Sequence, residues 1–531
     1  MTPAPVAPRP RSGAVAVAAG ILLSRVFGLA RQRVVSHFLG VGDAADALSA
    51  ALRIPNVLQN LLGEGVLSAS FVPVYARLRA EGREEDAGRL ARTVFAALAL
   101  VCSLAVLVGI ALAPAMVTVI AGGFASEKRE FTVGLVRLLF PGIGLLVMSA
   151  WCLGVLNSHR KFFISYSAPV IWNVAIIATL LLGASQGDAD GAARLVAVAA
   201  VLGSLLQFAV QLPWVVRALP RPNAGGPAVS VEFRRVVANF LPVVFGRGVV
   251  QVSAWLDTLI ASWVMPGATA VLLYAQNISM LPVSVFGMSV SASELTEMSG
   301  HGAESVESVI RERMGQSLRT IAFFVVPSSA TLLVLGDVVA GAILQTGRFQ
   351  RADTEWVWAV LAGSAIGLLA GTMGRLYNSA WYALHDTATP VKIAMVRVTL
   401  TASLGAVAAL LLPGWLAVDA RWGVAGLTAT AGMAAWVEYA LLRAKLNARI
   451  GHTGLPRGFL LRVWSAAGVA AGGGYALKLV LLTMHPVLLG VVVLGTVGIA
   501  YFGITHALGI TESAAVVGRL RARLRGPTGP S

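Results

Sequence analysis

The chain of 531 residues carries 57% hydrophobic and only 12% charged side chains, with a mean hydropathy of +0.77, which excludes an ordinary soluble domain. The formal net charge of +16 would suggest nucleic acid as a partner, but the basic residues are spread over loops without interleaved aromatic residues. Orientation in a membrane and contact with its anionic lipids explain them better. We therefore expect a membrane protein that binds no nucleic acid.

Apolar runs of about 18 residues or more recur along the whole chain, each long enough to cross a bilayer as a helix. Strand alternation is absent, so we predict an all-α integral membrane protein with about 14 transmembrane helices. The first run contains Arg25 and is longer than a cleaved signal, so we expect it to be retained. The predicted spans lie near 15–39, 44–75, 93–120, 131–157, 164–185, 193–216, 236–265, 268–299, 318–345, 356–384, 388–412, 422–442, 460–483 and 486–509.

The distribution of charge predicts the orientation of these spans. An even number of spans puts both termini on one side, where the segments hold about 26 Lys and Arg, against about five in the opposite loops. Because basic loops stay in the cytoplasm, we expect both termini to be cytoplasmic.

A weak internal repeat predicts two lobes of parallel topology. Asn157-Ser158 with Pro169-Val170 matches Asn378-Ser379 with Pro390-Val391, and Arg25 falls opposite Arg247 at nearly the same offset. We therefore predict two six-helix lobes followed by two appended helices. The boundaries are a cytoplasmic tail over 1–14, an N-lobe over 15–220, a C-lobe over 221–455, two helices over 456–510 and a basic cytoplasmic tail over 511–531.

Charged residues inside the apolar runs are the main functional signal, since each costs about 2.5–3.5 kcal/mol at mid-helix and persists only with a partner or a wet cavity. In the second run, polar residues recur at intervals that place them on one helical face: Asp46, Arg53, Asn60 and Glu64. The seventh and eighth runs carry similar polar stripes, so we expect one central hydrated cavity. Its candidate substrate-binding residues are Arg25, Arg31, Arg53, Asp46, Glu64, Arg247 and Asn277.

A purely structural role is the alternative for several of these charges. Asp46 with Arg53, or Arg247 with Asp257, could be buried ion pairs that only fix helix packing. For Lys478, Arg397 and Arg137 we expect snorkelling or pairing between helices, and we leave these three out of the site.

Three arginines on the first helix, Arg25, Arg31 and Arg33, suggest an anionic ligand, because a guanidinium stays charged at any depth and matches a phosphate bidentately. A pyrophosphate group is the natural candidate. The sequence has no Walker loop, no carboxylate pair for a metal and no nucleophile with a base, so we predict a transporter and not an enzyme. Cys102 and Cys152 lack metal-binding spacing and are expected to be packing residues.

Several motifs resemble the MurJ/MviN family of the MOP superfamily. The opening hairpin carries Ser24-Arg25-Val26-Phe27-Gly28 with Arg31, then Asp46-Ala47, Ile54-Pro55-Asn56, Gly63-Glu64-Gly65 and Phe71-Val72-Pro73. Later landmarks include Gly347-Arg348-Phe349, Tyr382-Ala383-Leu384, Asp386-Thr387 and Thr389-Pro390-Val391. The resemblance covers about residues 14 to 510.

This resemblance implies a flippase of the bacterial inner membrane that moves lipid II by alternating access for peptidoglycan synthesis. The partners implied are the polyprenyl-pyrophosphate-linked glycolipid, membrane lipids and other cell-wall synthesis proteins, and the two appended helices would hold the lipid tail. No organic cofactor is implied. Some members bind sodium, for which Asp257 and Asp386 are the candidate ligands here, although Asp386 also fits a helix cap before Thr387 and Pro390.

The chain also departs from the family pattern. The family usually places arginine where this chain has Gln59 or Asn60, and again at Asn277, whereas Arg33 and Arg247 stand at positions that are commonly uncharged. Two explanations are open. Either the cations are relocated around one cavity, or the chain is a divergent paralogue that acts as a transport-inactive membrane scaffold. A drug or cation antiporter of the MATE type, which would gather carboxylates such as Asp257, Glu294 and Glu297, is a further alternative.

Overall fold

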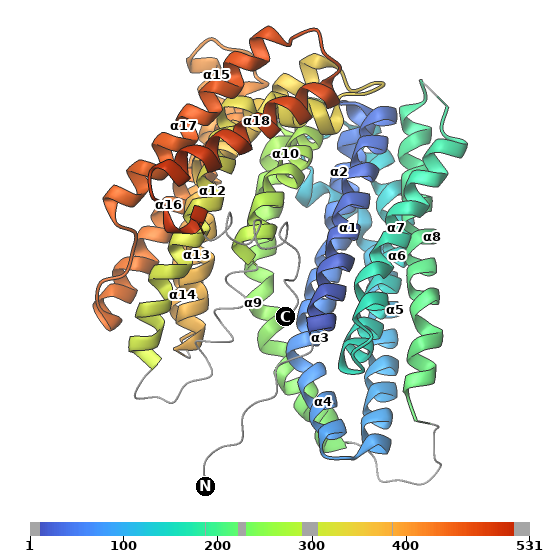
Figure 1. Ribbon diagram of the computed structural model, residues 1–531. Helices are drawn as coiled ribbons and strands as arrows, with labels where there is room; N and C mark the ends of the chain where they lie inside the picture. Colours follow the sequence, from blue (N-terminus) through green and yellow to red (C-terminus); the bar gives the residue numbers. More distant parts are fainter. Residues whose placement is uncertain (1–10, 186, 221–229, 289–305, 385, 515–531) are drawn as a thin grey trace, which may run out of the picture. The chain divides into compact units, whose positions relative to one another are not determined.

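A computed structural model describes residues 11–185, 187–220, 230–288, 306–384 and 386–514. The described residues form helices and no extended strand (Figure 1). They divide into two compact units: unit 1 contains Met1–Trp255 and Thr346–Arg348, and unit 2 contains Leu256–Gln345 and Phe349–Ser531.

Unit 1 is a helical bundle in which α1 packs mainly on α7, α2 on α6, and α6 on α8. Its helices are α1 (Arg11–Leu39), α2 (Asp43–Leu62), α3 (Glu64–Ser70), α4 (Val72–Ala80), α5 (Glu84–Ile120), α6 (Ser126–Ser158), α7 (Phe162–Gly183), α8 (Ala189–Ala218) and most of α9 (Ser230–Ser262).

The core of unit 1 combines apolar packing with a buried polar contact. Phe71, Tyr75 and Cys152 are fully buried in one cluster, and both cysteines are free thiols in apolar surroundings, which agrees with a packing role. The side chains of Gln207 and Gln211 on α8 both donate to Ser149 Oγ on α6, at 2.9 and 3.0 Å. Buried polar groups need such partners, so these bonds fix the register of the two helices.

Unit 2 is a second bundle, in which α13 packs closely on α16 and α12. Its elements are the end of α9, then α10 (Ala268–Pro282), the π-helical turn η1 (Val283–Met288), α12 (Val306–Leu344), α13 (Arg351–Ala383), α14 (Ala388–Ala406), η2 (Val407–Leu411), α15 (Leu412–Trp415), α16 (Trp422–Ile450), α17 (Arg457–Val480) and α18 (Pro486–Ala507).

Glycines make the contact between α13 and α16 possible. A Cβ atom on Gly367 would lie 2.3 Å from the Cα of Gly432, and one on Gly363 would lie 2.4 Å from the Thr428 hydroxyl oxygen. Small residues allow two helix backbones to approach closely, which is a common way to pack helices in a membrane.

The predicted spans agree with the helices, with differences at their ends. Within the described residues each predicted range coincides with a helix or a run of short helices, and the end of the range 268–299 lies outside them. In the described part of the chain nine helices are long and apolar enough to cross a membrane. The number of 14 spans therefore stays a prediction. The helices extend several residues beyond the apolar runs because helical hydrogen bonding continues past the hydrocarbon.

The second predicted span is not one uninterrupted helix. The chain is extended at Gly63 (φ −85°, ψ −153°), which ends α2 and begins α3, although Asp43–Ala80 as a whole is one candidate span. A Cβ at Gly63 would lie 2.3 Å from the Gln59 carbonyl oxygen, so this break requires glycine. Glu64 therefore does not continue the helical face of Asp46 and Arg53.

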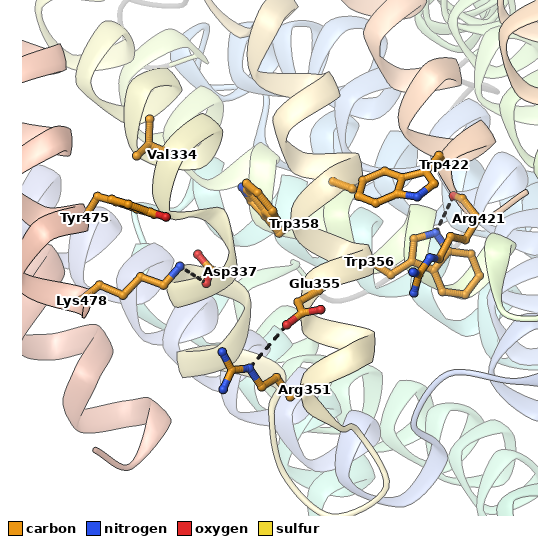
Figure 2. A pocket seen from close by; sticks show the side chains of 11 residues that line it. Val334, Asp337, Arg351, Glu355, Trp356, Trp358, Arg421, Trp422, Tyr475 and Lys478 are labelled. Carbon is orange, nitrogen blue, oxygen red and sulfur yellow. Dashed lines mark hydrogen bonds and ion pairs between the residues drawn. The ribbon is translucent and has the colours of Figure 1, made fainter. Parts of the chain in front are cut away.

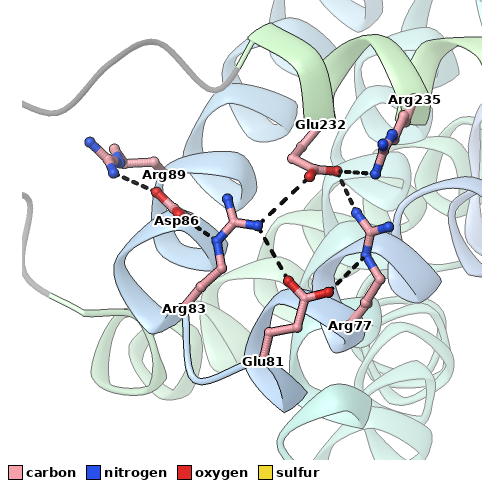
Figure 3. Close-up of polar contacts among 7 residues, drawn as sticks. All are labelled: Arg77, Glu81, Arg83, Asp86, Arg89, Glu232 and Arg235. Atoms are coloured by element: carbon pink, nitrogen blue, oxygen red, sulfur yellow. Dashed lines mark hydrogen bonds and ion pairs between the residues drawn. The ribbon is translucent and has the colours of Figure 1, made fainter.

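Within unit 1, an ion-pair network joins the start of α9 to α4 and to the start of α5 (Figure 3). Glu232 accepts from Arg77 at 2.6 Å and lies 3.4 Å from Arg235 and 4.0 Å from Arg83. Arg83 also pairs with Asp86 at 2.9 Å, and its hydrogen bonds to Asp86 and Glu81 raise the pKa of Arg83 above its ordinary value. The start of α9 therefore packs within unit 1, and the lobe boundary expected near residue 220 stays a prediction.

Candidate functional site

The residues predicted to bind the substrate or sodium are distributed over both units. Unit 1 contains Arg25, Arg31, Asp46, Arg53, Glu64 and Arg247, and unit 2 contains Asn277 with the candidate sodium ligands Asp257 and Asp386. The side chain of Arg247 in α9 lies outside the described residues, as do Glu294 and Glu297.

Arg31 is held against an aromatic ring within unit 1. Its guanidinium carbon lies 4.7 Å from the centre of the Trp172 ring on α7. The Trp172 indole in turn donates to the Ala200 carbonyl on α8 at 2.9 Å, so the ring cannot turn freely. A cation over an indole face is a favourable contact, and Arg31 itself is half-buried.

The remaining cations on α1 and α2 differ in exposure. Arg25 is exposed on α1, and Arg53 is half-buried on α2. Asn277 on α10 is exposed as well, whereas Tyr274 one turn earlier is buried against Phe349, with ring centres 5.6 Å apart. Their convergence on one cavity stays a prediction.

Asp46 has a partner that we did not predict. Its carboxylate is fully buried and lies 2.5 Å from Lys128 Nζ, which also contacts Asp43 at 2.8 Å. Lys128 lies 4.2 Å from the centre of the Phe124 ring. This cluster joins the first turn of α2 to the first turn of α6, and it supports the structural alternative for Asp46.

The candidate sodium ligands lie on different elements of unit 2. Asp257 lies near the end of α9, and Asp386 follows the end of α13. Asp386 accepts from the backbone N–H groups of Thr389 and Ala388 and from the Thr389 hydroxyl. The bonds from Thr389 hold the pKa of Asp386 below its ordinary value, and the carboxylate caps α14.

The charges that we left out of the site pair between helices, as expected. Lys478 Nζ lies 2.5 Å from Asp337 on α12, and Arg397 donates to Glu438 on α16 at 3.0 Å. The sequence shows that such charges need partners, but it does not identify Asp337, Glu438, Lys128 or Trp172, because each contact depends on helix packing.

Long apolar helices in two bundles, with cations paired or stacked inside the spans, define a multi-pass helical membrane protein. Two solved transporter structures share its fold. "Lipid II flippase MurJ, inward closed conformation" matches with a TM-score of 0.75 at 20% identity and covers 93% of this chain and 98% of that chain. An inward-facing MATE multidrug transporter of the MOP superfamily matches with a TM-score of 0.61 at 16% identity, over 82% and 98%.

Sequence comparison identifies the family to which the chain belongs. The family described as "Lipid II flippase MurJ" matches residues 35–501, and the chain therefore belongs to the MurJ family. A "Probable lipid II flippase MurJ" of Haemophilus influenzae is 31% identical, over 71% of this chain and 76% of that protein.

Proposed function

We propose that this chain is a flippase of the bacterial cytoplasmic membrane. Its cargo is lipid II, an undecaprenyl-pyrophosphate-linked disaccharide-pentapeptide, which it moves from the inner to the outer leaflet for peptidoglycan synthesis. The observation that carries this proposal is the family match over residues 35–501, which includes most of both units.

The arginines of unit 1 support an anionic cargo. Arg25 is exposed and Arg31 lies against Trp172, so α1 offers guanidinium groups with hydrogen-bond donors for the cargo's pyrophosphate. Arg53 and Arg247 are the further cations in the proposal. Because a guanidinium binds phosphate oxygens bidentately, these groups orient the head group as well as neutralise it.

Movement of the cargo requires two states in which the binding site faces opposite sides of the membrane. The division of the chain into two compact units suits such an alternating-access cycle. We place both termini and the ion-pair network of Figure 3 in the cytoplasm, following the excess of basic residues on that side. The proposed partners are lipid II, membrane lipids and other cell-wall synthesis proteins.

Sodium coupling is a separate part of the proposal. Asp257 is the better candidate ligand, since a carboxylate oxygen suits a hard cation and the Asp386 carboxylate already caps α14. Transport rates measured in sodium and in potassium buffers at equal ionic strength test it: equal rates contradict a role for sodium.

The proposed function is tested by complementation. The chain is expressed in a strain depleted of its own lipid II flippase, with Arg25→Ala as the impaired variant and Arg137→Ala as the matched control. Arg137 is an exposed arginine on α6 that contacts the Ile110 carbonyl and lies outside the proposed site. We expect the wild type and the control to restore growth and Arg25→Ala to fail.

Failure of the wild type, with the protein present in the membrane, would contradict the proposal and favour a transport-inactive scaffold. Export of cationic drugs without rescue would favour a MATE-like antiporter. The family match favours neither alternative.

A further inference from the structure

A pocket in unit 2 is lined by none of the residues proposed to bind the cargo. It encloses about 230 Å³ between α12, α13, α16 and α17 (Figure 2). Arg351 and Trp422 are the first residues of α13 and α16, and Lys478 lies in the last turn of α17. Helices of membrane proteins end in the layer of lipid head groups, and aromatic residues gather at that depth. The pocket therefore lies where head groups are its most abundant neighbours.

The wall of this pocket is fixed by packing. Helix α12 leaves helical geometry at Leu335 (φ −125°, ψ 21°), and the Trp358 indole donates to the carbonyl of Leu333 at 3.0 Å. A Cβ on Gly336 would lie 2.6 Å from Trp358 Cδ1, so the glycine allows this contact. The kink and the indole together hold the next residue, Asp337, in the pocket wall.

Asp337 leaves one acceptor unused. Its Oδ2 lies 2.5 Å from Lys478 Nζ, but its Oδ1 is buried and has no hydrogen-bond partner among the described residues. A buried carboxylate oxygen without a donor is unfavourable. Lys478 also lies 5.2 Å from the centre of the Tyr475 ring, so an aromatic face borders the same carboxylate. A ligand that carries an ammonium group with N–H donors would satisfy both features.

The other side of the pocket is basic. Arg421 contacts Asp419 at 3.7 Å and lies 5.8 Å from the centre of the Trp422 ring, which leaves most of its five N–H donors for a ligand. Arg351, which pairs with Glu355 at 3.4 Å, is 70% exposed. Guanidinium groups in this arrangement favour a phosphate.

We propose that this pocket binds the head group of phosphatidylethanolamine. The amine donates to Asp337 Oδ1 on one side of the pocket, and Arg421 on the other side binds the phosphate. The cavity is below the roughly 300 Å³ of a usual small-molecule site, so only a head group enters. The acyl chains remain outside, next to exposed apolar residues such as Leu333 and Leu479, the sequence neighbours of Val334 and Lys478 in the pocket wall.

The chemistry of the amine distinguishes this lipid from its relatives. Phosphatidylcholine carries a similar charge, but its quaternary ammonium has no N–H to donate to Asp337. Phosphatidylglycerol has hydroxyl donors but no cation to pair with the carboxylate. A preference for phosphatidylethanolamine over both therefore requires a carboxylate that accepts a hydrogen bond from a cation.

Native mass spectrometry of the purified full chain tests this inference. The chain is titrated with each of the three lipids at identical acyl chains, and the retained lipid is counted. We expect phosphatidylethanolamine to bind about tenfold more tightly than the others, the effect of one charge-assisted hydrogen bond. Asp337→Asn should remove the preference, and Arg421→Gln should weaken the binding of all three lipids.

Asp190→Asn is the matched control, because Asp190 lies in the first turn of α8 and belongs to unit 1. It should leave the preference unchanged. If Asp337→Asn does not fold, Tyr475→Leu replaces it, since that ring is 43% exposed and its removal should lower the preference without unfolding the chain. Equal binding of the three lipids by the wild type, or an unchanged preference in both variants, overturns the proposal. Neither result bears on the lipid II flippase function.

Discussion

Arg31 and Asp46 were both predicted from charge within an apolar run, yet they have different surroundings. Arg31 lies on the face of Trp172, whereas Asp46 is buried against Lys128. The sequence could predict that each charge needs compensation, because that follows from the cost of a charge in hydrocarbon. It could not predict which residue supplies it, since the partners come from other helices. Lys128 was missed because α6 begins before its apolar run.

Trp172 is expected to position Arg31 for the cargo. Trp172→Leu removes the ring and should slow flipping by about 2- to 30-fold, which corresponds to the roughly 0.5–2 kcal/mol of a cation–π contact. Trp172→Phe keeps a ring and should retain most of the activity. Flipping rates in vesicles with equal amounts of inserted protein provide the measurement, and a wild-type rate for Trp172→Leu would reduce Trp172 to a packing residue.

Arg247 is expected to replace a cation that the family usually has elsewhere. Arg247→Ala should abolish flipping while the protein remains inserted and expressed, because the pyrophosphate loses a charged partner. The same assay with Arg137→Ala should give the wild-type rate. Full activity of Arg247→Ala would show that Arg247 only supports helix packing.

At the scale of helices, apolar periodicity predicted where the spans lie, but not how they break or touch. The break at Gly63 and the contact of Gly367 with Gly432 depend on single glycines. The sequence alone does not show whether a glycine in an apolar run ends a helix or allows a close helix contact. The turns that contain the internal repeat do fall between helix pairs, α6 with α7 and α13 with α14. Those turns were predictable because the repeated Asn-Ser and Pro-Val pairs have the same spacing in both copies.

The α13–α16 contact makes a direct prediction about stability. Gly367→Ala places a methyl group against Gly432 and should destabilise the protein by about 1–3 kcal/mol, as overpacking does. Gly371 lies one turn further along α13, where an added Cβ would meet no neighbouring atom within 4 Å. Gly371→Ala should therefore be neutral or stabilising by up to about 1 kcal/mol. Melting temperatures in detergent compare the two, and equal shifts would contradict the close contact.

The turn between α6 and α7 should make stability depend on pH. Burial, together with the nearby charge of Arg79, lowers the pKa of His159 below 6.5, and Glu84 partly opposes this shift. The Nε2 atom of His159 lies 2.9 Å from the Tyr75 hydroxyl oxygen. The unfolded chain binds the proton more readily, so this stability is present above pH 6.5 and is lost as pH falls through the lowered pKa. In His159→Gln the melting temperature should depend less on pH below about pH 6.5. An unchanged pH profile in that variant would assign the effect to other groups.

At the scale of the whole molecule, composition was sufficient for the class of protein, and the motifs of the opening hairpin were sufficient for the family. The contact between Glu232 and Arg77 could not be predicted, because these residues are 155 positions apart in the chain and meet only through helix packing. The lobe boundary near residue 220 stays a prediction.

Reconstituted flipping is the most direct test of lipid II transport by this chain. The purified chain is inserted into vesicles that contain fluorescent lipid II, and a membrane-impermeant quencher reports how much lipid reaches the outer leaflet. We predict that the wild type moves lipid II much faster than protein-free vesicles and that Arg25→Ala and Arg247→Ala do not, with Arg137→Ala as the active control. A wild-type rate equal to that of protein-free vesicles, with the chain folded and inserted, would contradict the proposed flippase function.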